Sequence, residues 1–224
     1  MINWTDNSRG DGAAIRDAEV NAKNLTINAN FSGNERTDKG VISDAATHIK
    51  VSGDINIATN NDSVYTEGKG TTTIEGFKNL NITSSIAGYG LVDNGGGITV
   101  SGGTGSSVTI KNSGLAWDAH PTVGNSLWTG TGSALGKGIT VKADKIQIQS
   151  DNKSIIAGQG KGGEKFTVDL NAHAVDVTGT ISGIGGDIFI NSDTNGTVTL
   201  SSANKTENGW SSGEQSIDLM SNDT

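Results

Sequence analysis

The chain has 224 residues, of which 33 are glycine, one is proline and none is cysteine. Apolar residues make up only 33% of it, which favours a thin, continuous core over a globular one. The net charge of −8 at pH 7 argues against nucleic acid as a partner, because that binding depends on clustered Lys and Arg. The lack of cysteine excludes disulfides and thiolate metal ligands.

Residues 1–24 precede the regular pattern of the chain and are predicted to form an N-terminal cap or leading segment. A helical spacing of apolar residues occurs only over Ala13 to Ala22, as a short possible helix. Elsewhere the many Asn, Ser, Thr, Gly, Val and Ile residues favour strands and turns. No run of 18 apolar residues is present, so we expect no membrane-spanning helix.

From Leu25 onward, short segments of alternating polarity recur, and each places two apolar residues on one face of a strand. The main series reads NLTI, DINI, NLNI, SVTI, KIQI, AVDV and TVTL, ending at Ile27, Ile57, Ile82, Ile110, Ile148, Val177 and Leu200. A second segment precedes all but the first of these, as HIKV, TTI, GITV, GITV, KFTV and DIFI, and SIDL closes the series.

The spacing between successive main segments is 30, 25, 28, 38, 29 and 23 residues, which is typical of a solenoid. A weaker third segment, SVY, SIAGYG, SIIAGQG or TISGIG, follows several pairs and indicates three strands per coil. We therefore predict an all-β parallel β-helix of about seven coils over residues 25–219, with a tail at 220–224. Asn residues stacked between coils are expected to form side-chain amide ladders.

The interval of 38 residues is about 11 longer than the others and predicts a loop that extrudes near residues 112–137. This interval holds the only proline and two of the four tryptophans. An aromatic platform there would suit a sugar or an apolar chain, so the candidate ligand-binding residues are Trp117, Asp118, His120 and Trp128. The alternative is that the aromatic side chains pack down over the neighbouring face of the solenoid.

Several features resemble the passenger domain of a Gram-negative autotransporter, the type V secretion class, and particularly its adhesin branch. They are the V-T-I and I-N-I strands, the G-G-I-T-V and S-I-A-G-Y-G turns, and the acidic composition without cysteine, and they cover Leu25 to Leu219. The resemblance implies a right-handed parallel β-helix displayed at the cell surface. It also implies that this chain is an excised fragment, tethered to the outer membrane through a C-terminal β-barrel absent here.

No catalytic residues are expected. A serine protease would carry a G-D-S-G-type segment with His and Asp partners, and the sequence has none. A polysaccharide lyase would need a basic residue beside clustered Asp, but all three Arg lie in the first 36 residues and the Asp are dispersed. His48, His120 and His173 are about 50 to 70 residues apart, so we expect neither a metal site nor a cofactor.

The function expected from the sequence is that of a surface adhesin without catalytic activity. Long faces of Thr, Asn, Ser and Asp would bind either the same protein on neighbouring cells, giving self-association and biofilm formation, or a host glycan or matrix protein. The alternatives are a polysaccharide lyase or hydrolase on the same fold, and a purely structural stalk.

Overall fold

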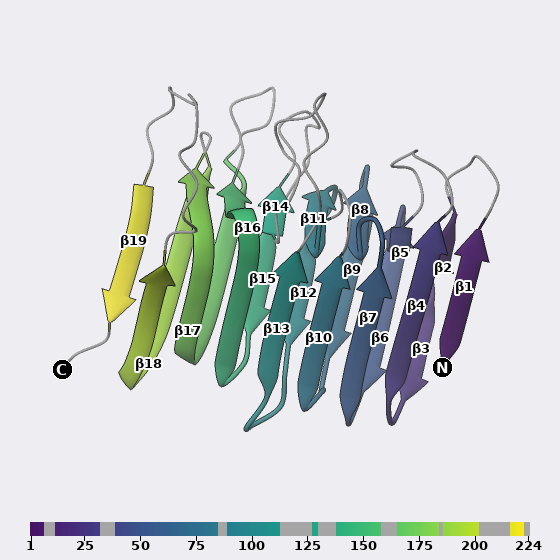
Figure 1. Cartoon of the computed structure of the whole chain (residues 1–224), viewed down its shortest axis with the longest axis horizontal. Helices are drawn as coiled ribbons and strands as arrows, with labels where there is room; N and C mark the ends of the chain where they lie inside the picture. Colours follow the sequence, from purple (N-terminus) through teal and green to yellow (C-terminus); the bar gives the residue numbers. More distant parts are fainter. Residues whose placement is uncertain are drawn as a thin grey trace.

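The chain folds into a solenoid of parallel β-strands, seen in a computed structural model (Figure 1). The structure describes residues 1–6, 12–31, 39–84, 89–112, 127–129, 138–157, 165–183, 186–201 and 216–221. These residues contain strands, turns and bends but no helix, and so no helix capable of spanning a membrane occurs among them. The all-β parallel solenoid predicted from the sequence is therefore confirmed.

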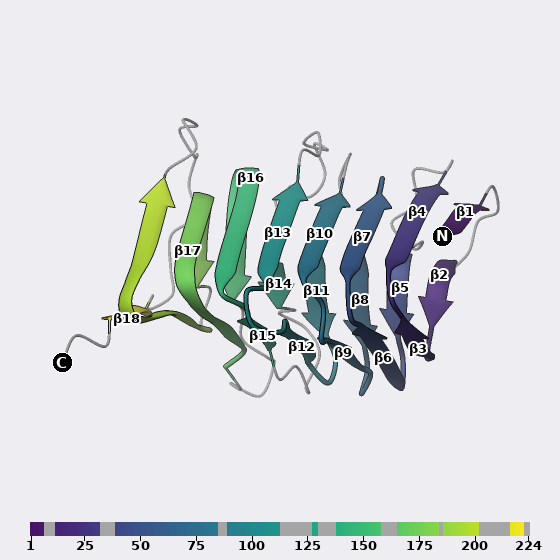
Figure 2. The ribbon, with the colours of Figure 1, turned by 90° about the horizontal axis from the view of Figure 1, so that it is seen from below.

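Most strands are short and belong to one of three stacks, which we name A, B and C (Figure 2). The A stack contains β2 (Ala13–Arg16), β5 (Lys39–Ser43), β8 (Val64–Glu67), β11 (Leu91–Asn94) and β14 (Leu127–Thr129). The B stack contains β3 (Glu19–Ala22), β6 (Ala46–Val51), β9 (Thr71–Glu75), β12 (Ile98–Ser101) and β15 (Ile139–Lys142). The C stack contains β1 (Ile2–Asp6), β4 (Leu25–Phe31), β7 (Asp54–Thr59), β10 (Asn79–Ser84) and β13 (Ser107–Asn112).

Three long strands continue the stacks toward the C-terminus. They are β16 (Lys145–Ala157), β17 (Thr167–Gly183) and β18 (Asp187–Ser201). Each passes from one stack into the next: β16 pairs first with β13 in the C stack and then with β14 in the A stack. The strand β19 (Ser216–Ser221) pairs with the first half of β18 and extends the B stack.

The solenoid has about five turns that consist of three separate strands, so the predicted count of about seven coils is slightly off. The difference arises at the C-terminal end, where the corners between stacks no longer interrupt the strands. The possible helix at residues 13–22 is instead the pair β2 and β3. The sequence predicts a third strand at the segment SIAGYG. The A-stack strand of that turn is β11, which begins just after this segment.

The main series of apolar segments pairs in the register that the sequence predicts. Ile27 aligns with Ile57, and the same column continues through Ile82, Ile110, Ile148 and Val177 to Leu200. Because side chains alternate across a strand, this register places the column inside the solenoid from Ile27 to Val177, whereas Leu200 in β18 is 43% exposed.

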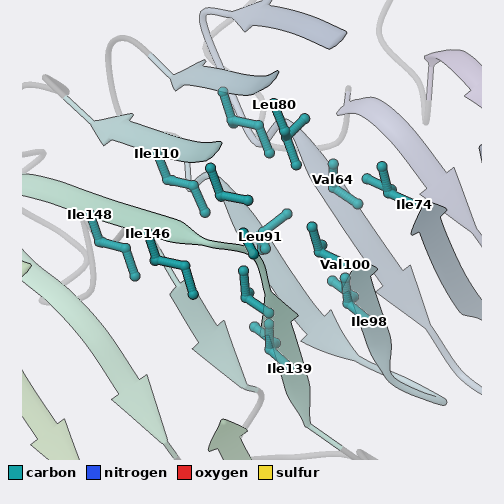
Figure 3. Close-up of a cluster of buried hydrophobic side chains, with 14 of the residues drawn as sticks. Val64, Ile74, Leu80, Leu91, Ile98, Val100, Ile110, Ile139, Ile146 and Ile148 are labelled. Atoms are coloured by element: carbon teal, nitrogen blue, oxygen red, sulfur yellow. The ribbon is translucent and has the colours of Figure 1, made fainter. Parts of the chain in front are cut away.

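The core is a narrow column of aliphatic side chains from all three stacks. Figure 3 shows Val64 and Leu91 from the A stack, Ile98 and Ile139 from the B stack, and Leu80, Ile110 and Ile148 from the C stack. Each of these is at most 1% exposed. Burying such a side chain stabilises the fold by about 1.5 to 3 kcal/mol. This repeated burial explains how a chain with few aromatic residues holds a regular rod.

Candidate functional site

The predicted ligand-binding residues fall in the interval between β13 and β15. Trp117, Asp118 and His120 lie outside the residues that the structure describes. Trp128 belongs to β14, and its backbone aligns with that of Val92 on one side and Ile156 on the other. Ligand binding by these four residues stays a prediction.

The strand β14 divides the interval that the sequence assigns to one loop. The added length lies in two connections, residues 113–126 before β14 and 130–138 after it, whereas β5 and β6 are joined by residues 44–45 alone. The chain thus returns to the A stack in the middle of the interval. The strand β14 pairs with β11 of the preceding turn and with β16 of the following turn. This pairing satisfies its backbone polar groups, which explains why so short a strand forms within the A stack.

Position 128 continues an outward column of the A stack. The column includes Ile42, Tyr65 and Val92, which alternate with residues of the core. Ile42 is 3% exposed and Val92 is 0% exposed, although neither belongs to the main core cluster. The backbone of residue 128 is in register with this column of mostly buried residues.

The outer surface of the C stack, which we name the C face, presents a regular array of polar side chains. Its central column aligns Asn56 with Asn81 and continues through Thr109 and Gln147. The amide Nδ2 of Asn81 donates to Oδ1 of Asn56 at 3.0 Å, which is the kind of ladder predicted between coils. These bonds between neighbouring turns hold the amides in fixed positions.

A second column of the C face runs beside the first and carries charge at two of its positions. It aligns Asp54, Asn79, Ser107 and Lys145. Asn79 donates to Asp54 Oδ1 at 2.7 Å and accepts at its own Oδ1 from Ser107 Oγ at 2.8 Å. Asp54 and Lys145 are both exposed. The column therefore places an acidic group three turns away from a basic one on the same surface.

The outer surface of the B stack, which we name the B face, carries a threonine column and a cluster of charges. Thr73, Thr99 and Thr140 align with one another. Earlier in the same stack, Glu75 Oε1 lies 3.2 Å from both His48 Nε2 and Lys50 Nζ. The hydrogen bond from Lys50 holds the pKa of Glu75 below its ordinary value of 4.5, with a smaller contribution from His48.

Replacing Lys50 with alanine is expected to raise the pKa of Glu75 toward 4.5, because the main donor to its carboxylate is lost. A lowered pKa in the folded state stabilises the protein above the unfolded-state pKa, and this contribution disappears as the pH falls through the folded-state value. The measurement is an NMR titration of the Glu75 side-chain carboxyl carbon. Lys78→Ala serves as the control, and an identical Glu75 titration in both variants would contradict the assignment.

A hollow of about 280 Å³ opens at the corner where the B stack meets the C stack, over the last turns. Its floor consists of small side chains, which are Ala143, Ala172 and Ser192. The polar lining residues form two rows, which we call the walls: Lys142, Asn171 and Asn191, which align with one another, precede the small residues, and Asp144, His173 and Asp193 follow them. We name this feature the corner hollow.

Sequence reasoning missed the corner hollow, although a signal was present. Three successive turns carry a polar, a small and a polar residue where the B stack ends: Lys-Ala-Asp at 142–144, Asn-Ala-His at 171–173 and Asn-Ser-Asp at 191–193. Residues in equivalent positions of successive turns lie one strand spacing apart. The repeat therefore places all of the polar side chains at one corner of the solenoid.

The polar side chains of the corner hollow are held by contacts with one another. His173 Nδ1 lies 2.6 Å from Asp193 Oδ1, and both side chains are exposed. Asn191 Nδ2 donates to Asn171 Oδ1 and to Asp169 Oδ1, each at 3.0 Å. Among the described residues no group of three or more His, Cys, Asp or Glu side chains converges as a metal site.

One buried polar network, centred on Asp62, has a structural role. Lys39 Nζ lies 3.1 Å from Asp62 Oδ2 and 5.1 Å from the centre of the Tyr65 ring. The other oxygen of Asp62, Oδ1, accepts from the amide of Tyr89 at 2.9 Å. Both oxygens of Asp62 thus have N–H partners within the fold itself, as expected for a buried carboxylate that stabilises a corner.

Comparisons with known proteins assign no family to the chain. No family model, no curated protein and no solved structure matches it. The surface chemistry of the solenoid is therefore the basis for assigning a function.

Proposed function

We propose that this solenoid is part of a bacterial surface adhesin and that it acts without catalysis, through self-association of its C face. The observation that carries the proposal is the continuous C face itself, which runs from β4 to β18 and bears mainly amide and hydroxyl side chains. Such side chains both donate and accept hydrogen bonds, so two copies of one face are chemically suited to each other.

The size of the C face predicts a weak contact between any two copies. Seven strands about 4.8 Å apart and about five residues wide give an area of about 550 Å². A stable interface buries about 800 Å² on each partner. Adhesion would therefore require many copies on each cell, whose simultaneous contacts give avidity. Weak single contacts with strong collective binding suit reversible attachment between cells.

Charge favours one arrangement of two C faces. Consider two C faces related by a twofold axis that lies in their interface, runs parallel to the strands and passes between β10 and β13. This axis places β7 of one copy opposite β16 of the other. Because Asp54 and Lys145 occupy one column, the axis places Asp54 opposite Lys145 of the second copy, and the reverse contact follows by symmetry. The same operation places Asn56 opposite Gln147, so that amide meets amide.

A charge swap tests this arrangement by sedimentation velocity over a range of protein concentrations. Asp54→Lys and Lys145→Asp alone should each weaken the dimer about tenfold or more, because like charges then face each other. The double variant should return the dissociation constant to within about threefold of the original, because the opposite charges are restored in reverse.

Glu67→Lys, an exposed change of the same charge in the A stack, is the matched control and should leave the dimer unchanged. A monomer at every concentration, together with no aggregation of cells that display the chain, would overturn the proposed function. A dimer that the double variant does not restore would overturn only the twofold arrangement.

A further inference from the structure

We propose that the corner hollow is a saccharide-binding site that takes one or two hexose or hexosamine units of a glycan and discriminates against uronates. It lies at the corner between the B and C stacks, and none of the residues that carry the self-association proposal lines it. The inference therefore goes beyond the proposed function and does not rest on it.

The size and shape of the hollow limit the ligand. Its volume of about 280 Å³ is just below the range of pockets for drug-sized molecules, about 300 to 1,000 Å³. The polar walls extend over three successive turns, and two steps of about 4.8 Å make them about 10 Å long. The small side chains of Ala143, Ala172 and Ser192 leave room above the floor. These dimensions fit one or two sugar rings.

The two walls differ in their hydrogen-bonding character. Since Asn171 Oδ1 accepts from Asn191, the Asn171 amide Nδ2 projects a donor from one wall, beside the ammonium group of Lys142. The opposite wall offers acceptors, which are the carboxylates of Asp144 and Asp193. A hydroxyl group both accepts and donates, so a sugar hydroxyl can bridge the walls, accepting from one and donating to the other.

Contacts within the protein already orient the polar side chains of the corner hollow in the absence of a ligand. The contact of 2.6 Å between His173 Nδ1 and Asp193 Oδ1 fixes the plane of the imidazole ring. The amide of Gly105 donates to Asp144 Oδ2 and fixes that carboxylate as well. Side chains that are already ordered lose less conformational entropy on binding. A preorganised polar site of this kind binds a small hydrated ligand better than flexible surface residues do.

The charge of the walls sets the preference among sugars. Asp144 and Asp193 contribute two carboxylates against the single ammonium group of Lys142. A uronate would bring its own carboxylate close to these two, which disfavours binding through repulsion. N-acetylglucosamine is uncharged, and glucosamine carries an ammonium group that the carboxylates attract. The order of affinity expected is therefore glucosamine or N-acetylglucosamine above glucuronate.

The test is an NMR titration of the protein with glucosamine, N-acetylglucosamine and glucuronate, followed through the side-chain amide signals of Asn171 and Asn191 and the ring signals of His173. We expect dissociation constants in the millimolar range for the first two sugars and at least fivefold weaker binding of glucuronate. His173→Ala and Asp193→Asn should each weaken binding at least fivefold, and the second of these keeps the shape of the side chain.

His48→Ala is the matched control, because His48 is also partly exposed and paired with a carboxylate, at 3.2 Å, but lies outside the hollow. It should leave binding unchanged. The proposal is overturned if no sugar shifts these signals at about 50 mM, well above the millimolar range expected. It is equally overturned if glucuronate binds as tightly as the other two, or if His48→Ala weakens binding as much as His173→Ala.

Discussion

Replacing Asp93 with alanine is expected to lower the free energy of unfolding by about 3 to 5 kcal/mol, because four donors, three of them in buried hydrogen bonds, lose their acceptor. Asp93 is 0% exposed. Its Oδ1 accepts hydrogen bonds from Thr66 Oγ1 at 2.5 Å and from the amides of Gly95 and Gly97 at 3.0 Å. Its Oδ2 accepts from the amide of Gly138 at 2.7 Å.

These bonds join three successive turns of the solenoid. Thr66 lies in the A-stack strand β8 of one turn, Gly95 and Gly97 form the corner of the next, and Gly138 precedes β15 in the turn after that. In a repeat protein, contacts between neighbouring turns carry much of the stability and the cooperativity. The loss of Asp93 should therefore weaken the coupling between turns as well as the local corner.

Urea unfolding, monitored by circular dichroism, measures the loss of stability. Two further variants are expected to show smaller losses. Thr66→Val removes a single donor of similar shape and should cost about 1 kcal/mol. Asp93→Asn keeps one acceptor oxygen and should fall between Thr66→Val and Asp93→Ala. Equal unfolding midpoints for the wild type and Asp93→Ala would show that the network contributes nothing to stability.

The C stack was predictable from sequence because its apolar residues alternate without interruption. Ile82, Ile110 and Ile148 stand in segments with the same pattern, and a strand period of two leaves only one register that buries them. The A stack was harder to predict. Its strand β5 is buried on both faces, so Val41 and Ile42 follow each other without the alternation that marks a strand with one exposed face.

The polar features depended on how the turns are brought together in space, which the sequence shows only indirectly. Asp93 stands in a stretch with Asn and Gly, which is typical of any turn, and only the fold brings Thr66 and Gly138 to it. The corner hollow likewise depends on where three separate corners meet. Trp128 was singled out because it is rare, whereas its register in the A stack follows from pairing with distant strands.

The glycine at position 70 offers a direct test of how closely the turns pack. A Cβ atom added there would lie 1.8 Å from the carbonyl oxygen of Ser43 and 2.9 Å from the amide nitrogen of Asp44. These are backbone atoms of the preceding turn, so no change of rotamer relieves the overlap. The Gly70 carbonyl also accepts from the amide of Gly96 at 2.7 Å, which ties the same corner to the following turn.

Gly70→Ala is therefore expected to destabilise the solenoid by about 3 kcal/mol or more, since the second and third turns must separate to admit the methyl group. Gly103→Ala is the matched control, because its Cβ would meet no atom closer than 3.7 Å. Both substitutions reduce the entropy of the unfolded chain to a similar extent, by about 0.4 to 1 kcal/mol, so their difference isolates the overlap. Urea midpoints measure that difference, and equal midpoints for the two variants would mean that the corners are looser than the spacing of Ser43 and Gly70 indicates.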